Sequence, residues 1–270
     1  MTKKTEQSAR STKTSVIALI LAGLIAFLYV SGLPGILFIE IELFDVQPEL
    51  IAVFINTILA LLLGLILHKV LIPDLELGLG KSSLKAGLEK YLLSCLVILL
   101  IPLIAFSISL QPFDRSPTIV KLLFEGIVYI AAVALIEEFF CRGLLQNALA
   151  NLFHKNKNSQ LLSVLVAAFI FGAGHVFGMI GEAPILVVCK VLWSIGLGIY
   201  FGSIYTLTAN LVLVAFFHFI INLSGFPFIF STQQTYPTDS VIALVLASIG
   251  AAGYGIYLLQ TKQALAKQDE

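Results

Sequence analysis

The sequence predicts an all-α integral membrane protein, a polytopic bundle of about eight transmembrane helices. Of the 270 residues, 59% are hydrophobic and only 12% are charged, whereas soluble domains carry about 25% charged residues. Long apolar runs recur along the chain, separated by short polar breaks. None shows the two-residue alternation of a membrane β-barrel, so we expect helices, which satisfy their own backbone polar groups in lipid.

The first expected helix, 16–39, follows a basic tail that contains Lys3, Lys4, Arg10 and Lys13. This is also the pattern of a cleaved signal peptide, but the run reaches the ~20 residues that a span needs, and we interpret it as an uncleaved helix. The other expected spans are 50–72, 88–110, 119–147, 160–181, 184–205, 208–223 and 240–260. We therefore expect a tail at 1–15, one transmembrane domain at 16–260 and a second tail at 261–270.

The basic residues predict the orientation. The segments placed inside hold thirteen Lys and Arg: the N-terminal tail, 69–90, 142–159, 205–208 and the C-terminal tail. The segments placed outside hold two: 40–49, 111–121, 181–184 and 224–239. The positive-inside rule then places both termini in the cytoplasm. The remaining base, Lys190, lies in the sixth span, and we interpret it as snorkelling towards the outer interface.

Other features of composition narrow the function classes. The 16 basic and 16 acidic residues balance, so net charge predicts no nucleic-acid partner. The three cysteines lie in apolar runs without a CxxC pair, so neither a disulfide framework nor a thiolate metal site is expected. The chain has no internal repeat like the paired halves of many secondary transporters.

Ionisable side chains inside a span cost ~2.5–3.5 kcal/mol each on insertion scales, which makes them functional candidates. In "EEFFCR", Glu138 and Arg142 are four residues apart and can pair on one helix face. Glu137 is rotated by about 100° from Glu138, so it can point elsewhere. A buried salt bridge that fixes helix packing would explain Glu138 and Arg142, but it leaves Glu137 unexplained.

Two further motifs place polar groups in later spans. In "FGAGH", Phe171 and His175 share a face, and in "HFIIN" His218 and Asn222 do so. Each motif alone is also compatible with helix packing or interhelical hydrogen bonding. His68 and His154 lie beside lysines at the predicted cytoplasmic face, so interfacial exposure explains both.

Together these groups suit the hydrolysis of a peptide bond by water. A glutamate can accept a proton from water, and a neutral histidine can orient that water or bind Zn²⁺. The pair His218 and Asn222 can stabilise a tetrahedral oxyanion. There is no HExxH motif, so a metal would need ligands from three helices. The candidate metal ligands, if a metal is used, are Glu137, His175, His218 and Asn222.

The three motifs match EExxxR, FxxxH and HxxxN/D of the CAAX-protease and bacteriocin-processing (CPBP or ABI) family of intramembrane peptidases, in the same order and spacing. The chain resembles this family over roughly 123–223. The resemblance implies a type II CAAX prenyl endopeptidase-like bundle with a hydrophilic cavity inside the membrane. It implies that Glu137 and His175 activate water and that His218 and Asn222 steady the oxyanion. Glu138 joins this catalytic set and pairs with Arg142, which gives structural support together with Phe171.

The resemblance leaves several alternatives open. Members are treated as metalloproteases or as glutamate proteases, so the cofactor is either a divalent metal such as Zn or none. Substrates would be membrane-associated peptides or proteins, and the compact chain with short tails suggests a prokaryotic plasma membrane. We therefore do not assign prenylated substrates. The alternative functions are a non-catalytic self-immunity or scaffolding protein of the same fold and, with less support, a transporter.

The expected spans create a difficulty of depth. With a rise of 1.5 Å per residue, Glu137 would lie ~6 Å and His175 ~22 Å from the inner face, a mismatch of about 15 Å. The two meet only if the fourth helix continues past Arg142, towards Asn151, and the fifth begins outside the hydrocarbon, or if both tilt strongly. We expect the site nearer the cytoplasmic side.

Overall fold

The computed structural model describes residues 13–14, 16–21, 48–79, 84–109, 119–225 and 238–266. These residues form helices and connections without a strand, which confirms the all-α class. The longer helices are α3 (Pro48–Leu71), α4 (Leu84–Ser109), α5 (Ile119–Glu138), α7 (Ser159–Gly174), α8 (Pro184–Thr208), α9 (Leu211–Asn222) and α11 (Thr238–Ala266). They coincide with seven of the eight expected spans, while most of the first span, 16–39, lies outside the described residues.

Four stretches of the described helices are long and apolar enough to cross a membrane, namely Leu84–Ser107, Ser159–Met179, Pro184–Thr208 and Ser240–Lys262. The chain is an integral membrane protein, but these helices do not establish the expected count of eight crossings. α9 has only 12 residues, about 18 Å of helix against a hydrocarbon core of ~30 Å. It begins late because Ala209 is left-handed (φ 47°) and the Asn210 side chain caps the helix by accepting from the Leu213 amide at 2.9 Å.

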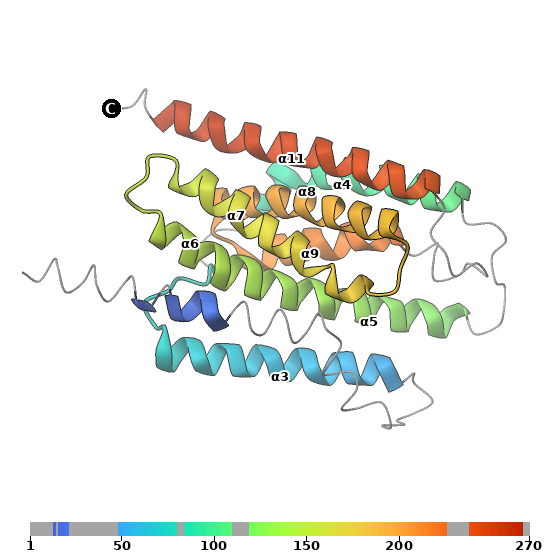
Figure 1. The fold of residues 1–270 in the computed structure, drawn as a ribbon, viewed down its shortest axis with the longest axis horizontal. Helices are drawn as coiled ribbons and strands as arrows, with labels where there is room; N and C mark the ends of the chain where they lie inside the picture. The colour runs from blue at the N-terminus through green and yellow to red at the C-terminus, as the bar shows by residue number, and fades with distance from the viewer. Residues whose placement is uncertain are drawn as a thin grey trace, which may run out of the picture.

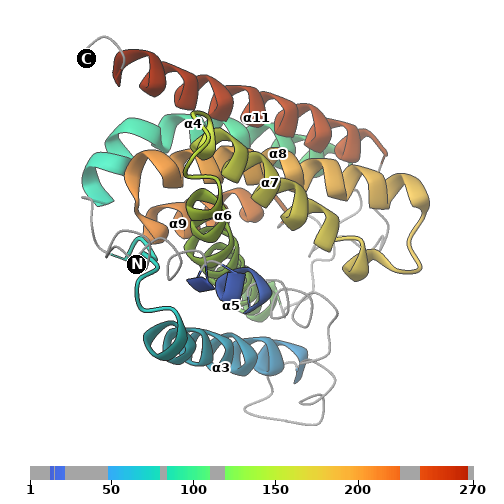
Figure 2. The same cartoon turned by 60° about the vertical axis from the view of Figure 1, so that its left-hand side comes forward.

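The bundle is built around α8, which packs against α7 on one side and α11 on another. α9 packs against α5 and α4, and α3 packs against α5. Figures 1 and 2 show α11 and α3 on opposite sides of the bundle, with α5, α7, α8 and α9 between them. The largest fully buried side chains include Arg142, Tyr200, Phe201 and Phe217, so the core holds a charged group among aromatic rings.

Glycine allows a close contact between α7 and α8. A Cβ added at Gly172 would lie 2.3 Å from Ile195 Cγ1 and 3.0 Å from the Val191 carbonyl oxygen. Only a residue without a side chain fits there, as in the small-residue interfaces of other membrane bundles. A Cβ added at Gly174, two residues later, would have no atom of another segment within 4 Å. The two glycines of FGAGH therefore do not both serve packing.

The fourth expected span continues beyond its predicted end at 147. α5 passes directly into a π-helix, η1 (Phe139–Gln146), and then into α6 (Asn147–Leu152), and Figure 1 shows them as one continuous rod. A π-helix adds residues to each turn and is frequent at functional sites. Arg142 therefore belongs to this continuous helix, with its side chain buried, and not to a connection between helices. The number of Lys and Arg residues in the segments predicted to lie inside falls from thirteen to twelve.

This continuation removes the difficulty of depth. A short connection joins α6 to α7, with Leu152 and Ser159 at its ends. Glu137 lies fifteen residues before Leu152 and His175 sixteen residues after Ser159, so both lie about 22–24 Å from that connection. The predicted mismatch was wrong because the fourth helix was ended too early.

Candidate active site

The carboxylate of Glu137 lies between the imidazoles of two other helices. Its Oε1 atom is 3.9 Å from Nε2 of His175, and its Oε2 atom is 3.5 Å from Nε2 of His218. Glu137 is the penultimate residue of α5, His175 follows the last residue of α7, and His218 lies within α9. The structure thus brings together the carboxylate and both histidines of the three sequence motifs.

Glu138, the adjacent residue, points to a different set of partners. Its Oε1 atom accepts hydrogen bonds from Nη1 of Arg142 at 2.9 Å and from Nδ1 of His218 at 2.7 Å. The predicted pair of Glu138 and Arg142 is confirmed, and it is buried, with 0% and 2% of the side chains exposed. The two glutamates therefore face different neighbours, as their 100° separation on a helix predicts.

Arg142 is held in a cage that neutralises and orients it. Its Nη2 atom donates to the carbonyl of Gly198 on α8 at 3.2 Å. Its guanidinium lies over the rings of Phe171 and Phe201, at 4.9 and 5.6 Å from their centroids. Cation–π contacts of this kind add to the ion pair with Glu138. Arg142 consequently ties η1 to both α7 and α8.

The hydrogen bonds of the two histidines determine which ring nitrogen faces Glu137. Nδ1 of His175 lies 2.9 Å from the carbonyl oxygen of Phe171, which can only accept, so Nδ1 carries the proton. Nδ1 of His218 likewise donates to the carboxylate of Glu138. In the neutral rings both Nε2 atoms are then acceptors, and they face the carboxylate of Glu137. The two Nε2 atoms and the carboxylate oxygens all accept hydrogen bonds, so a donor between them is favourable. The two O–H groups of a water molecule would fit this arrangement.

Aromatic rings fix the orientation of both imidazoles. Phe171 meets the ring of His175 edge-on at 4.7 Å, and Phe201 stacks on His218 at 4.9 Å with 25° between the planes. Phe171 thus contacts both His175 and Arg142. These ring contacts help to keep the imidazole nitrogens in one direction, and a reaction centre needs that pre-organisation.

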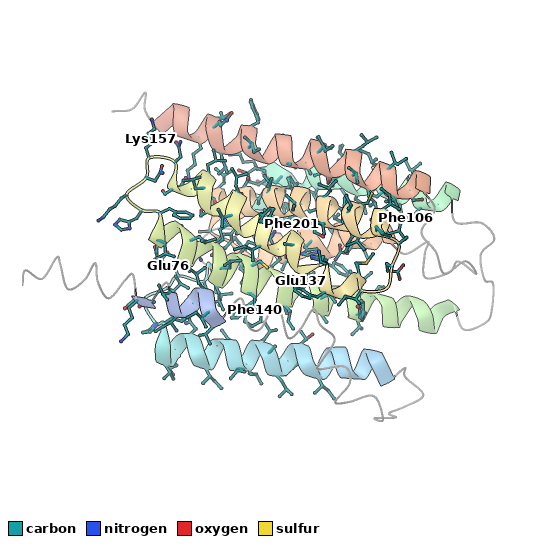
Figure 3. The ribbon with its side chains drawn as sticks, viewed as in Figure 1. Glu76, Phe106, Glu137, Phe140, Lys157 and Phe201 are labelled. Carbon is teal, nitrogen blue, oxygen red and sulfur yellow. The ribbon has the colours of Figure 1, made fainter. Side chains whose placement is uncertain are left out.

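A cavity of about 450 Å³ adjoins this cluster, within the range of about 300–1,000 Å³ typical of ligand sites. Glu137, His175 and Asn222 line it, together with apolar side chains from α4, α5, α8 and α11. Phe106, near the end of α4, and Val241, near the start of α11, also line it, so the cavity lies towards the end of the bundle opposite the α6–α7 connection. In Figure 3, Glu137 lies part-way between Phe106 at one end and Lys157 at the other.

This position bears on the expectation of a site nearer the cytoplasmic side. The α6–α7 connection carries Lys155 and Lys157, and it belongs to the segments that the basic residues place inside. The cavity lies towards the other end. With the orientation predicted from the basic residues, the cavity would lie nearer the outer face. The expected position of Glu137 close to the α6–α7 connection came from ending the fourth helix too early.

Sequence reasoning missed part of the cavity wall. Lys190, interpreted as snorkelling to the interface, is half-buried and lines the cavity. Trp193, the single tryptophan, lines it as well. Leu186, Lys190 and Trp193 are spaced by four and three residues on α8, and this helical spacing was the available signal.

The two histidines interpreted as interfacial take no part in the site. His68 lies 2.6 Å from the carbonyl oxygen of Leu75, and His154 lies 2.7 Å from that of Asn151. Both bonds are local and lie away from the residues that line the cavity. Their role is therefore confined to the ends of α3 and α6.

A divalent metal would need several donor side chains around one point. In the described ranges, no group of three or more His, Cys, Asp and Glu side chains is arranged to hold a metal ion. Zn²⁺ requires its nitrogen and oxygen ligands at about 2.0–2.2 Å from one point. The reaction proposed below is written with the chain's own residues alone.

Comparison with protein families shows what the motif-bearing segment is similar to. The family model described as "Rce1-like: Type II CAAX prenyl endopeptidase Rce1-like" matches residues 119–224. Over this segment the chain is similar to the Rce1-like family. The Rce1-like segment extends from the first residue of α5 into η3 and contains Glu137, Glu138, Arg142, His175 and Asn222 together with the other motif residues. It confirms the resemblance found in the three motifs and broadly supports a CAAX-protease-like endopeptidase activity. A search of curated proteins gave no significant match.

Proposed function

We propose that the chain is an intramembrane endopeptidase that hydrolyses peptide bonds of membrane-associated peptides or proteins with water activated by Glu137. The observation that carries this proposal is the convergence of three side chains, of which Glu137 and His175 line the cavity. The Glu137 carboxylate lies 3.9 and 3.5 Å from the Nε2 atoms of His175 and His218. A water held among them would lie against a cavity that can take a peptide.

The residues divide the reaction between them. Glu137 removes a proton from the water, and the resulting hydroxide oxygen bonds to the peptide carbonyl carbon. Asn222 lines the cavity, and its amide N–H groups are the donors that we assign to the oxyanion. The C–N bond then breaks, and Glu137 returns its proton to the departing nitrogen. His175 and His218 orient the water through Nε2, and each ring is fixed by the bond at its Nδ1 atom.

This scheme changes one role that the resemblance implied. His218 was expected to steady the oxyanion with Asn222. Its Nδ1–H bonds to Glu138, so in the neutral ring its Nε2 atom is an acceptor, which suits a water better than an oxyanion. The proposal therefore assigns His218 to the water and leaves the oxyanion to Asn222.

The test compares membranes that contain the full-length wild type with membranes that contain Glu137→Gln. Peptides released by the wild type and absent from the variant would identify substrates by mass spectrometry. We expect rates at least 10²-fold lower in the variant, as for loss of a general base. Glu89→Gln is the matched control, because it makes the same chemical change at an exposed position of α4. There the Glu89 carboxylate pairs with Lys85 at 3.9 Å.

The same variants separate the proposal from a non-catalytic immunity or scaffolding role. Such a role predicts full biological activity from Glu137→Gln and His175→Ala proteins that fold normally. Identical peptide profiles from wild type and Glu137→Gln would contradict the proposed protease.

A further inference from the structure

Ser224 is a buried polar residue in the cavity wall, two residues beyond Asn222. It belongs to η3 (Leu223–Gly225), the 3₁₀ turn that follows α9, and only 3% of its surface is exposed. Asn222, Ser224 and Gly225 all line the cavity, and a Cβ added at Gly225 would have no atom of another segment within 4 Å. The end of α9 therefore faces the open space beside Glu137.

The hydroxyl of Ser224 has no hydrogen-bond partner among the described residues. Other buried serines of the bundle bond locally: Ser163 donates to the carbonyl three residues before it at 2.8 Å, and Ser203 to the carbonyl four residues before it at 2.7 Å. Burying a hydroxyl without a partner is unfavourable, so such groups are nearly always hydrogen-bonded. The Ser224 hydroxyl retains access to the cavity, unlike the enclosed Oε2 atom of Glu138. Its partner can therefore come from the molecule that occupies the cavity.

Two other roles fit Ser224 less well. A serine nucleophile needs a base within hydrogen-bond reach of its hydroxyl, and no described side chain accepts a hydrogen bond from Ser224. A residue that only packs against its neighbours is favoured without the hydroxyl, since an unbonded hydroxyl costs more to bury than a methyl group. The position of the hydroxyl suits a donor to an oxygen atom of a bound ligand.

Ser224 is close enough to Asn222 for both to bind one oxygen atom. Two residues at this helix end are about 3–4 Å apart along the axis, so the hydroxyl and the carboxamide can reach the same oxygen from neighbouring points. His218, one turn before Asn222, has its Nε2 atom 3.5 Å from the Glu137 carboxylate. The chain thus presents first the imidazole assigned to the water and then two donors along the same wall.

We propose that the Ser224 hydroxyl is a catalytic donor that, together with the Asn222 amide, binds the oxyanion formed when hydroxide adds to the peptide carbonyl. The inference rests on the proposed endopeptidase function and deepens it. The O–H group donates a hydrogen bond to the developing negative oxygen and keeps its proton. The carbonyl re-forms as the C–N bond breaks, and this bond then weakens. A hydrogen bond to an ionised oxygen is stronger than one to a neutral carbonyl, so it favours the transition state over the bound substrate.

The test measures binding of two uncleavable probes, so it does not depend on turnover. Both are analogues of acetyl-Leu-Leu-Ala amide: a phosphinate replaces the peptide bond between the two leucines in one, and a ketomethylene group replaces it in the other. The phosphinate is tetrahedral and carries a negative oxygen, whereas the ketone is planar and neutral. The full-length protein in detergent is titrated with each probe. The fluorescence of Trp193, the single tryptophan of the chain, reports on the cavity that it lines.

We expect the wild type to bind the phosphinate more tightly than the ketone. Ser224→Ala should weaken phosphinate binding about 10- to 100-fold, the range for a hydrogen bond to a charged group, and should leave ketone binding unchanged. Ser224→Thr keeps the hydroxyl and should keep most of the phosphinate affinity. On a peptide that the wild type releases, Ser224→Ala should lower kcat about 10²-fold with KM little changed.

Ser163→Ala is the matched control for the loss of a buried hydroxyl. Ser163 is 1% exposed and bonds within α7, near the α6–α7 connection at the other end of the bundle. This variant should bind both probes as the wild type does.

Three results would overturn the proposal. The first is a wild type without preference for the phosphinate, including no response to either probe, and the second is a Ser224→Ala protein that keeps the wild-type preference. The third is an equal loss of affinity for both probes, which would assign Ser224 to packing. Failure of the protease proposal is a separate result, because it would appear as the absence of Glu137-dependent release of peptides. Glu137-dependent cleavage together with unchanged phosphinate binding by Ser224→Ala would reject the Ser224 donor alone.

Discussion

Glu138 and His218 are eighty residues apart in the sequence, and their side chains meet at 2.7 Å in the buried core. The same carboxylate oxygen also accepts from Arg142. Glu138 therefore couples the helix that carries Glu137 to the helix that carries the second imidazole. It fixes which nitrogen of His218 faces Glu137, much as second-layer carboxylates orient histidines in other sites. This network, and the packing around it, can be tested by four measurements.

Glu138→Gln should lower turnover more than substrate affinity. The neutral amide is a weaker partner for Nδ1 of His218, so the imidazole loses its fixed tautomer, and we expect kcat to fall about 10- to 100-fold with KM little changed. Steady-state kinetics on a peptide released by the wild type would measure this. A parallel rise in KM with unchanged kcat would show that Glu138 acts on substrate binding and not through His218.

Arg142→Lys should destabilise the fold although the charge is kept. Arg142 donates to Glu138 and to Gly198 from two different nitrogens and lies between two aromatic rings. A lysine has no planar fork and cannot reproduce both bonds, so we expect a loss of about 1.5–3 kcal/mol.

A thermal melt in detergent with a thiol-reactive dye measures this loss, because Cys95 and Cys141 are buried free thiols. The melting temperature of Arg142→Lys should fall by several degrees. Wild-type stability in this variant would mean that the cage around Arg142 contributes little to folding.

Gly172→Ala should separate α7 from α8 and disturb the site. The added Cβ would meet Ile195 and the backbone oxygen of Val191, and a backbone atom cannot move aside as the tip of a side chain can. Because His175 is one turn beyond Gly172, we expect both lower stability, by about 1–3 kcal/mol, and lower activity.

Gly250→Ala on α11 is the matched control, since no atom lies within 4 Å of its added Cβ. There the greater helix propensity of alanine should leave stability unchanged or raise it by up to about 1 kcal/mol. Equal effects of the two substitutions would contradict the close contact at Gly172.

Chelators should leave peptide cleavage unchanged. The described residues offer no group of three metal-binding side chains, and the proposed reaction uses water held by Glu137 and two histidines. Activity after treatment with EDTA or 1,10-phenanthroline, together with elemental analysis of the purified protein, measures this. Loss of activity that is restored by stoichiometric Zn²⁺ would replace the glutamate scheme with a metalloprotease.

The sequence by itself determined the helical membrane class, because the apolar runs and the scarcity of charge leave few alternatives in lipid. It also determined the local pairs within one helix, such as Glu138 with Arg142 and Phe171 with His175, since a spacing of four residues places two side chains on one face. The three motifs identified the segment that the family comparison matches.

Only the tertiary structure decided how these faces meet. The π-helix after Glu138 and its continuation to Leu152 have no clear signal in the apolar pattern, and they set the depth at which Glu137 meets His175. The bond of Glu138 to His218, and the direction of Lys190 into the cavity, depend on contacts between helices distant in sequence. Helical periodicity fixes which residues share a face, but the packing of one helix on another selects what that face touches, and for that reason the position of the site required the structure.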